Sequence, residues 1–370
     1  MTKPPGTGHE KSMIRGIFNQ RVLTSFRVLQ FVVLLLVADN SHSLAGQQDG
    51  KLDVYFIDVE GGASTLIVTP AGESVLVDTG NRGDRDPDRI FKAAQAAGLS
   101  RIDYCVITHY HADHYGGLKQ LSELMPIEHL YDNANENPTA DRPPPEYSQA
   151  RVEDRSLLSP SDKLPLKQRE GSPNLSIQCL AAHKKIIDAP AGAKENPFEK
   201  DSKPKAEDRS DNANSIVQLL RFGDFKFYDG GDLTWNMEHD LAAPINRIGT
   251  VDVYQVTHHG LAQSNNPVLV KAIEPTVAIM NNGTIKGCEP EVFATMKSTP
   301  SIKAIFQLHK NLRPDGDVNN TELQFIANIE RRCEGNPIHM AVSPDAKQYV
   351  VSIPATGFAQ TYETKIGNKE

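Results

Sequence analysis

The sequence predicts a layered α/β protein with mixed sheets and with helices on the outer faces of those sheets. Two observations lead to this fold class: short apolar runs bounded by turn residues recur in both halves of the chain, and helical patterns lie between them. The 370 residues are enough to bury a large core, and we find no short internal repeat.

Composition narrows the class of protein. Hydrophobic residues make up 39% and charged residues 23% of the chain, as in globular proteins. The formal net charge of −8 disfavours a protein that coats nucleic acid, so we expect no stable nucleic-acid complex. The four cysteines lie far apart without a CxxC pair, which excludes a zinc ribbon and a disulfide-dense scaffold. The oligomeric state stays open.

Residues 1–45 have the pattern of a secretory signal peptide. Five Lys or Arg residues precede an apolar run from Phe31 to Ala38, which is too short to cross a bilayer. Small residues at Ser43 and Ala45 suit cleavage before Gly46. We therefore expect an exported protein, periplasmic or extracellular, with no membrane span after cleavage; the alternative is an uncleaved anchor. Export permits disulfides, but spacing does not say which cysteines pair.

The regular elements are expected in two groups. In the first half, strands are predicted over 53–59, 65–69, 75–78, 104–108 and 175–181, and one helix begins at Asp86-Pro87 and ends at Gly98. In the second half, strands are predicted over 215–220, 226–229, 251–257, 277–280, 303–307, 339–343 and 348–353, with helices over 267–273 and 290–297. Residues 133–211 hold three consecutive prolines and many charges, so we expect part of this stretch to be a long insertion or lid.

Three histidines and one aspartate fall within six residues directly after a predicted strand: His109, His111, Asp113 and His114. A turn can direct all four side chains toward one point, which an extended strand with its period of two cannot do. Imidazole nitrogens and a carboxylate suit Zn²⁺, with Mn²⁺ or Fe as alternatives. The sequence therefore predicts a metal site here. The isolated histidines His129, His239, His309 and His339 are expected to be ordinary surface or core residues, with His309 a slight exception because it follows a predicted strand end.

The HxHxDH pattern resembles the signature of the metallo-β-lactamase superfamily. The resemblance extends over residues 51–355: residues 56–64 look like the FIDVGQGD-type opening of the hydrolase domain of competence protein ComEC, and Asp78 lies in a stretch that matches the family's first motif. It implies a four-layer αββα metallo-β-lactamase sandwich with a long inserted loop, formed by residues 46–370. It also implies that His109 and His111 hold one metal, that Asp113 and His114 hold a second, and that Asp78 orients the ligands from behind.

Two later stretches match the same family. Asp229-Gly230-Gly231-Asp232 stands where the family carries its bridging carboxylate, so the resemblance assigns that role to Asp232. His258-His259-Gly260 looks like the PHHGS motif of the ComEC-like branch. One histidine should be the last metal ligand and the other should face the substrate; we prefer His259 as the ligand and His258 as the substrate contact.

The sequence departs from the family pattern at one position. Many members carry a further histidine before the bridging aspartate, whereas this chain has Asn212-Ala213-Asn214-Ser215. His183 is the nearest candidate, and a solvated loop histidine is the alternative. The site of the first metal is therefore expected to be open-sided, to hold the metal weakly or to be completed by water, so one or two Zn²⁺ ions per chain are expected.

The N-terminal pattern and the resemblance together predict an exported metallohydrolase, in which the resemblance implies Asp113, Asp232 and His258 as catalytic residues. Bound metals would activate a water, and the second metal and His258 would stabilise negative charge on the substrate. The ComEC-like motifs favour phosphodiesters, such as nucleic acid or a phosphorylated envelope component. The alternatives are a lactone or β-lactam ring as substrate, or a non-catalytic metal-binding module that recognises a partner through residues 133–211.

Overall fold

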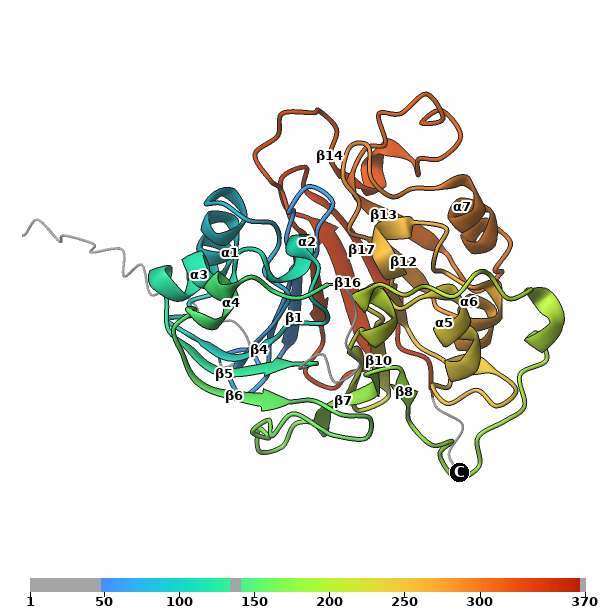
Figure 1. Ribbon diagram of the computed structural model, residues 1–370, viewed down its shortest axis with the longest axis horizontal. Coiled ribbons are helices and arrows are strands. Elements are labelled where there is room, and N and C mark those ends of the chain that lie inside the picture. Colours follow the sequence, from blue (N-terminus) through green and yellow to red (C-terminus); the bar gives the residue numbers. More distant parts are fainter. Residues whose placement is uncertain (1–47, 134–140, 367–370) are drawn as a thin grey trace, which may run out of the picture. The chain divides into compact units, whose positions relative to one another are not determined.

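The computed structural model describes residues 48–133 and 141–366, in which the strands form two mixed sheets (Figure 1). The predicted signal peptide, residues 1–45, lies outside the described residues. The first sheet has the strand order β17–β16–β15–β1–β2–β3–β4–β5–β6. Its strands are β1 (Leu52–Phe56), β2 (Thr65–Val68), β3 (Ser74–Val77), β4 (Ile102–Val106), β5 (Ile127–Asp132), β6 (Val152–Leu157), β15 (Ile338–Val342), β16 (Gln348–Ile353) and β17 (Phe358–Glu363).

The second sheet has the strand order β14–β13–β12–β11–β10–β9–β7–β8. Its strands are β7 (Leu175–Ala182), β8 (Lys185–Ile186), β9 (Val217–Phe222), β10 (Phe225–Asp229), β11 (Val253–Gln255), β12 (Val277–Met280), β13 (Ala304–His309) and β14 (Ile326–Asn328). Strands β10 to β14 run parallel to one another, whereas β9 is antiparallel to both of its long neighbours.

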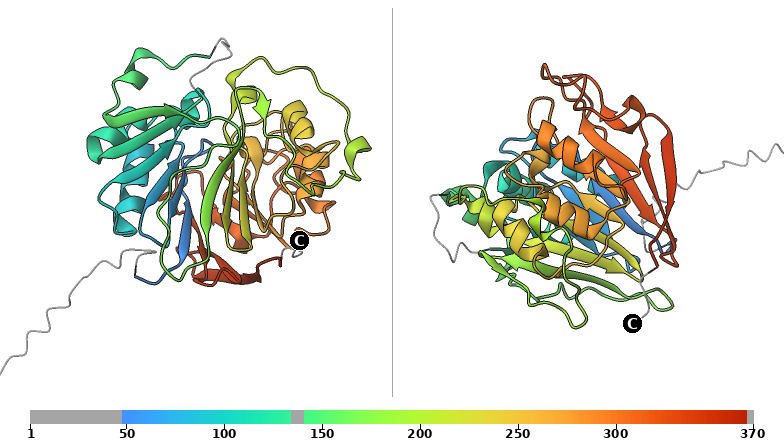
Figure 2. Two further views of the ribbon diagram at one scale, coloured as in Figure 1. Left: turned by 90° about the horizontal axis from the view of Figure 1, so that it is seen from below. Right: turned by 90° about the vertical axis from the view of Figure 1, so that its right-hand side faces the viewer.

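The two sheets pack face to face, and helices cover the outer face of each (Figures 1 and 2). Apolar side chains from both sheets fill the layer between them; the rings of Phe56 and Phe227, for example, meet edge to face at 5.7 Å. The helices are α1 (Arg85–Ala96), α2 (Ala112–Tyr115), α3 (Leu118–Leu124), α4 (Pro145–Ser148), α5 (Trp235–Ala242), α6 (Pro267–Ile273) and α7 (Pro290–Lys297), and the 3₁₀ helices are η1 (Glu199–Asp201), η2 (Asp211–Asn214), η3 (Thr257–Gly260) and η4 (Leu323–Phe325). The predicted four-layer α/β sandwich is confirmed.

Local sequence explains the elements that were predicted with the right bounds. The Asn266 side chain accepts a hydrogen bond from the Val268 N–H, and Pro267 occupies the first helical position, so α6 begins where the sequence indicates. The helix α1 ends before Gly98, whose left-handed backbone suits a helix end. β15 and β16 form the expected antiparallel pair.

The strands that sequence reasoning missed are mostly edge or short strands. β6 and β17 lie at the two edges of the first sheet, and most of their residues are exposed or only partly buried. An edge strand of this kind carries no apolar run, so the signal used to find strands is absent from its sequence. β5, β14 and the helix α5 were also missed.

The stretch 133–211 contributes strands as well as loops. Its described part supplies β6 to the first sheet and β7 and β8 to the second. Residues after β8 run past the second layer of helices, where the Lys205 ammonium stacks 3.7 Å from the centre of the Trp235 ring. That part of this stretch acts as a lid stays a prediction.

Two further features bear on the predictions about export. All four cysteines are free thiols, and three of them are buried. Within residues 48–133 and 141–366, no helix is long and apolar enough to cross a membrane.

Candidate metal centre

The HxHxDH segment follows β4 directly. β4 ends at Val106, His109 and His111 lie in the turn that follows, and α2 carries Asp113 and His114. The backbone packs so tightly here that a Cβ on Gly62 would lie 2.5 Å from the Asp113 carbonyl oxygen. Only glycine fits that position, and the turn is held in place as a result.

Asp232, His258 and His259 reach the same place from the second sheet. β10 and β11 are parallel neighbours, so the residues that follow their carboxyl ends lie at one edge. His258 and His259 both have left-handed backbones, with φ of 55° and 56°, which is uncommon for residues other than glycine. This turn directs both imidazoles toward Asp232, and their Nε2 atoms lie 3.3 and 3.4 Å from Asp232 Oδ2.

Four ligand atoms form the first donor group: one each from Asp113, His114, Asp232 and His259. His114 Nε2 lies 3.2 Å from Asp232 Oδ2, 3.3 Å from His259 Nε2 and 3.7 Å from Asp113 Oδ2. His259 Nε2 lies 3.2 Å from Asp113 Oδ2 and 3.4 Å from Asp232 Oδ2. A tetrahedron of ligands at about 2.0–2.1 Å from Zn²⁺ has edges of about 3.3–3.4 Å. The spacing of these atoms therefore suits a tetrahedral ion.

The second donor group consists of His109, His111 and, again, Asp232. His109 Nε2 lies 3.8 Å from Asp232 Oδ2, and the rings of His109 and His111 are 4.7 Å apart. His111 is the more open residue, and its Nε2 lies 3.3 Å from Asp141 Oδ2. The two donor groups share Asp232, so a carboxylate lies where a bridging ligand would be needed.

Hydrogen bonds behind the ligands fix the histidine tautomers. The Thr108 hydroxyl donates to Asp78 Oδ2 at 2.8 Å, so its oxygen is left to accept from His109 Nδ1, 3.1 Å away. His114 Nδ1 donates to Asp78 Oδ2 at 2.7 Å. With Nδ1 used as a donor, the neutral form of each histidine, which is the form that binds metal, carries its free lone pair on Nε2, and these Nε2 atoms face Asp232. Asp78 thus lies where the sequence predicted it to act, behind the ligands.

Several buried atoms of the centre lack hydrogen-bond partners within the described part of the chain. They are Nε2 of His109, Nδ1 of His259 and both carboxylate oxygens of Asp232. A buried carboxylate that accepts no hydrogen bond is costly unless a cation neutralises it. Together with the lone pairs of the surrounding imidazoles, this donor set fits a metal ion.

The pKa shifts indicate that, without metal, protonated histidine balances the negative charge of the carboxylates in the centre. Burial would raise the pKa of Asp232, but His114, His258 and His259 hold it well below its ordinary value. Burial would lower the pKa of His114, but the carboxylates of Asp232, Asp78 and Asp113 raise it well above 6.5. Burial lowers the pKa of His109 well below its ordinary value. A metal that binds here must therefore displace a proton from His114.

His183 is placed differently from both sequence-based alternatives. It is fully buried rather than solvated, at the end of β7, and its N–H donates to the Asn214 carbonyl at 3.3 Å. It belongs to neither donor group found among the described residues. The segment with Asn214 instead supports the centre through its neighbour Ser215, whose hydroxyl accepts from the Asp232 N–H at 3.2 Å.

Besides Asp141, sequence reasoning missed Thr108, Ser264 and Lys286, which contact the centre. Thr108 orients His109 and contacts Asp78, Ser264 lies 3.2 Å from His258 Nδ1, and Lys286 donates to Asp113 Oδ2. Thr108 could have been found, because it stands between the strand and the first histidine. No local pattern marks Lys286, which lies far from the motifs in sequence.

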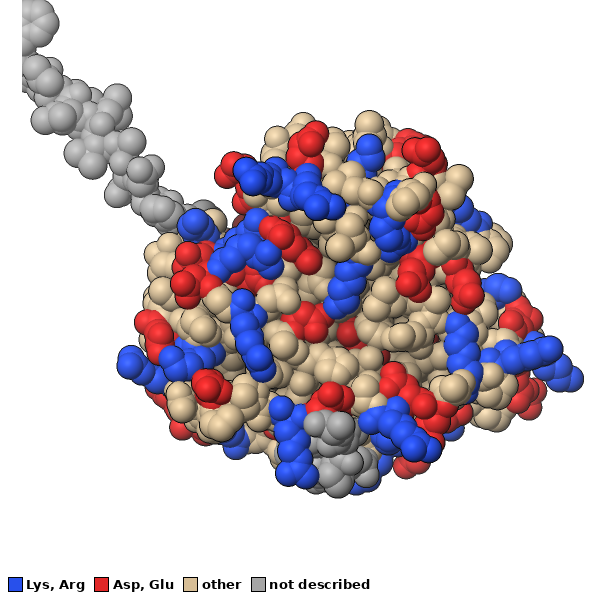
Figure 3. Space-filling view, turned by 45° about the horizontal axis from the view of Figure 1, so that its top comes forward, with Lys and Arg blue, Asp and Glu red and all other residues tan. Residues whose placement is uncertain are grey.

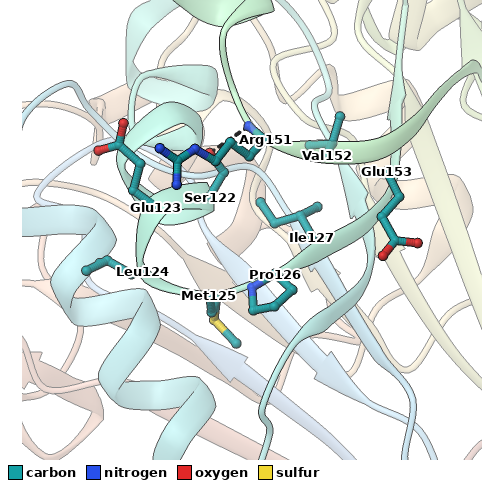
Figure 4. A pocket seen from close by; sticks show the side chains of 9 residues that line it. All are labelled: Ser122, Glu123, Leu124, Met125, Pro126, Ile127, Arg151, Val152 and Glu153. Atoms are coloured by element: carbon teal, nitrogen blue, oxygen red, sulfur yellow. Dashed lines mark hydrogen bonds between the residues drawn. The ribbon is translucent and has the colours of Figure 1, made fainter.

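A cavity of about 500 Å³ borders α2 and includes Arg82, Tyr115, Lys119 and Tyr147 in its lining. On the face shown in Figure 3, Lys and Arg side chains lie around recessed carboxylates. A second cavity, of about 430 Å³, is lined by residues 122–127 and 151–153 (Figure 4). It lies at the amino ends of β5 and β6, whereas the predicted ligands follow the carboxyl end of β4, which runs parallel to β5. The second cavity is therefore not part of the candidate centre.

Comparisons with known proteins agree with this architecture. Residues 57–178 match the family model of the Metallo-beta-lactamase superfamily. A curated relative, Beta-lactamase-like protein 2 homolog of Caenorhabditis elegans, is 34% identical over 62 residues, which are 17% of this chain and 21% of that protein. The match thus spans about a fifth of the relative's length.

Solved structures with similar folds include YhfI of Bacillus subtilis, a metallo-β-lactamase fold protein, with 12% identity, a TM-score of 0.41, and coverage of 70% of this chain and 96% of that one. CmlA, a diiron β-hydroxylase of Streptomyces venezuelae, has 15% identity, a TM-score of 0.40, and coverage of 69% and 52%. The match over residues 57–178 and the two mixed sheets with helices are consistent with the α/β fold of the metallo-β-lactamase superfamily.

Proposed function

We propose that this protein is an exported metal-dependent hydrolase that cleaves phosphodiester bonds. The observation that carries the proposal is the first donor group, in which five distances between ligand atoms lie between 3.2 and 3.7 Å. Such spacing, combined with the unpartnered oxygens of Asp232, supports Zn²⁺ or a similar ion as the resident metal. Export through residues 1–45 is supported by their basic and apolar pattern.

When bound, a metal pair would lower the pKa of a coordinated water toward neutrality and so supply a nucleophile. The first group would use Asp113, His114 and His259, the second His109 and His111, with Asp232 shared between them. Asp232 would neutralise both cations and orient the water. Asp78 and Thr108 would keep the imidazoles in the tautomer that binds metal.

The hydrogen bonds of His258 bear on the role predicted for it, a contact to the substrate. The Ser264 hydroxyl donates to the Leu233 carbonyl at 2.6 Å, so its oxygen is left to accept from His258 Nδ1. Burial lowers the pKa of His258 to about 4, so the ring is neutral and its Nε2 is an acceptor. In this form the ring would accept a proton or a hydrogen bond from the water or the substrate, and it would stabilise negative charge on the substrate only after it has taken up a proton.

Two observations support a phosphodiester as the substrate. The stretches 56–64 and 256–260 look like motifs of the ComEC-like branch. The cavity beside α2 is lined by the cationic Arg82 and Lys119 as well as by the acidic Glu146, and cationic groups attract a phosphate. A neutral lactone would need no cations of this kind.

The experiment is turnover of bis-p-nitrophenyl phosphate by the purified protein, with and without a chelator. We expect turnover that a chelator abolishes and that added Zn²⁺ or Mn²⁺ restores. Asp113→Ala and His109→Ala should abolish turnover and reduce bound metal, and the exposed Asp240→Ala should change neither. Metal-dependent turnover of lactones or β-lactams alone would refute the phosphodiester assignment, and bound metal without turnover of any ester, lactone or lactam would favour a binding module.

A further inference from the structure

Lys286 brings a positive charge to the candidate metal centre. It lies in the loop between β12 and α7, and its ammonium group donates to Asp113 Oδ2, the atom that also lies 3.2 Å from His259 Nε2. The side chain is 36% exposed, so one side of it faces solvent. Among the described residues, Lys286 is the only Lys or Arg in an ion pair with one of the six predicted ligands.

The loop that carries Lys286 is packed against the ligands. Gly287 has a left-handed backbone with φ of 84°, and a Cβ there would lie 1.9 Å from the His259 carbonyl oxygen. The Gly283 N–H donates to the Lys286 carbonyl at 3.0 Å, which closes the loop. A Cβ on Gly61 would lie 3.3 Å from Lys286 Cβ. The stem of the lysine therefore has little freedom near the backbone.

Arg313 holds the same loop from the other side. Its guanidinium donates to the carbonyls of Ile285 at 3.3 Å and Cys288 at 2.9 Å, and also to that of Gly287. Asp315 fixes the guanidinium in turn, with an oxygen 2.9 Å from Nη2. A hydrogen-bonded support of this kind is what positions a group precisely enough to bind one part of a substrate.

Charge balance indicates what the ammonium group does. As a metal ligand, Asp113 would share its negative charge with a cation and would attract Lys286 less strongly. Lys286 is then a partly exposed cation at the edge of the centre, where an anionic oxygen of a substrate would approach the nucleophile.

We propose that Lys286 binds the anionic oxygen of the substrate beside the metal centre, and that Arg313 is a positioning residue for it. This inference rests on the proposed function, because it assumes that the centre holds metal and acts on an anionic ester. It makes Lys286 a determinant of specificity for anionic over neutral substrates.

The test measures binding of inorganic phosphate to the metal-loaded protein by isothermal titration calorimetry, together with metal content by elemental analysis. Lys286→Met should raise the dissociation constant for phosphate by about tenfold or more, as expected for loss of a charge-assisted hydrogen bond, while metal content stays the same. Lys286→Arg, which keeps the charge, should bind more tightly than Lys286→Met. The matched control is Lys347→Met, a lysine that is 80% exposed and lies outside the centre.

Kinetics provide the second measurement and separate this inference from the proposed function. Lys286→Met should raise KM for bis-p-nitrophenyl phosphate and leave KM for a neutral p-nitrophenyl ester within about threefold of the wild type. Unchanged phosphate affinity, or loss of metal from Lys286→Met, would overturn the role of Lys286 even if the wild type cleaves phosphodiesters. If the protein cleaves no phosphodiester but binds phosphate in a way that depends on Lys286, the proposed function would be refuted. The inference that Lys286 binds an anionic oxygen would then still hold.

Discussion

Two clusters of buried acidic and histidine side chains lie at strand ends of this molecule, and they differ in how their charges are satisfied. The first is the candidate metal centre around Asp232. The second consists of Asp58, His309 and Cys333, whose potential ligand atoms lie within 4.8 Å of one another. By residue type and spacing alone, both clusters could hold a metal ion.

In the second cluster, side chains of the protein satisfy the carboxylate of Asp58. Asp58 Oδ1 accepts from His309 Nε2 at 2.6 Å and from the Glu60 N–H at 2.9 Å, and Oδ2 accepts from Arg89 at 2.9 Å. Burial would raise the pKa of Asp58, but the hydrogen bond from His309 and the charges of His309 and Arg89 lower it. In the first cluster, neither oxygen of Asp232 has a hydrogen-bond partner among the described residues. A ring nitrogen of the second cluster, His309 Nδ1, also lacks a partner among the described residues, so it is the unpartnered buried carboxylate, rather than the ligand types, that distinguishes the candidate metal site from a structural ion pair.

The largest effect should come from Asp232→Asn. A neutral amide cannot neutralise two cations, so bound metal should fall from near two ions per chain to well below one, and kcat should fall by about 10³ or more. Elemental analysis and turnover measure the two effects, with circular dichroism as a check on folding. A folded variant that keeps both ions would remove Asp232 from the centre.

The second largest effect should come from Asp58→Asn, which should lower the free energy of unfolding and leave the metal content unchanged. Asp58→Asn leaves the Arg89 guanidinium, whose side chain is 14% exposed, with only Glu60 as a charged partner among the described residues, so the unfolding free energy should fall by about 2–3 kcal/mol. Urea denaturation of the metal-free protein measures the loss, and elemental analysis should show unchanged metal content. Loss of metal from this variant would mean that the two clusters had been distinguished wrongly.

Metal binding should depend on pH through His114. The pKa of His114 in the metal-free fold is raised above 6.5, so a proton competes with metal below that raised value. Asp232 and Asp113 also raise the pKa of the ligand His259, so affinity should fall by at least about tenfold for each pH unit of acidification in this range. Titrations with a chelating competitor at several pH values measure this slope, and the His114→Gln variant should make it shallower. A pH-independent affinity would show that His114 is not a ligand.

The same shift has a consequence for the metal-free protein. Because the folded-state pKa of His114 exceeds the unfolded value, its proton stabilises the fold fully below about pH 6.5, and this contribution is lost as the pH rises through the raised pKa. Bound metal should remove the effect. Unfolding free energy compared with and without metal across this pH range would measure it.

The smallest effect should come from Cys333→Ser. The Cys333 thiol lies 3.5 Å from Asp58 Oδ2, a weak contact that a serine hydroxyl can replace, so stability should change by less than about 0.5 kcal/mol. Metal content should not change. Elemental analysis that shows metal lost from this variant would identify the second cluster as a metal site.

The sequence predicted the layered fold and the residues that converge on Asp232, because their information is local. His109 to His114 follow one strand, and the bounds of α6 and α7 depend on neighbouring prolines. Contacts between distant segments were not predictable in the same way. Lys286 meets Asp113 across 173 positions, and the burial of His183 results from packing at the end of β7 rather than from its lysine-rich surroundings.

The most direct test of the central claim is anomalous X-ray diffraction from crystals of the protein at the absorption edge of its bound metal. Two peaks should lie beside Asp232, one toward Asp113, His114 and His259 and the other toward His109 and His111, with none at Asp58. The absence of a peak at Asp232, or a peak among Asp58, His309 and Cys333, would contradict the account.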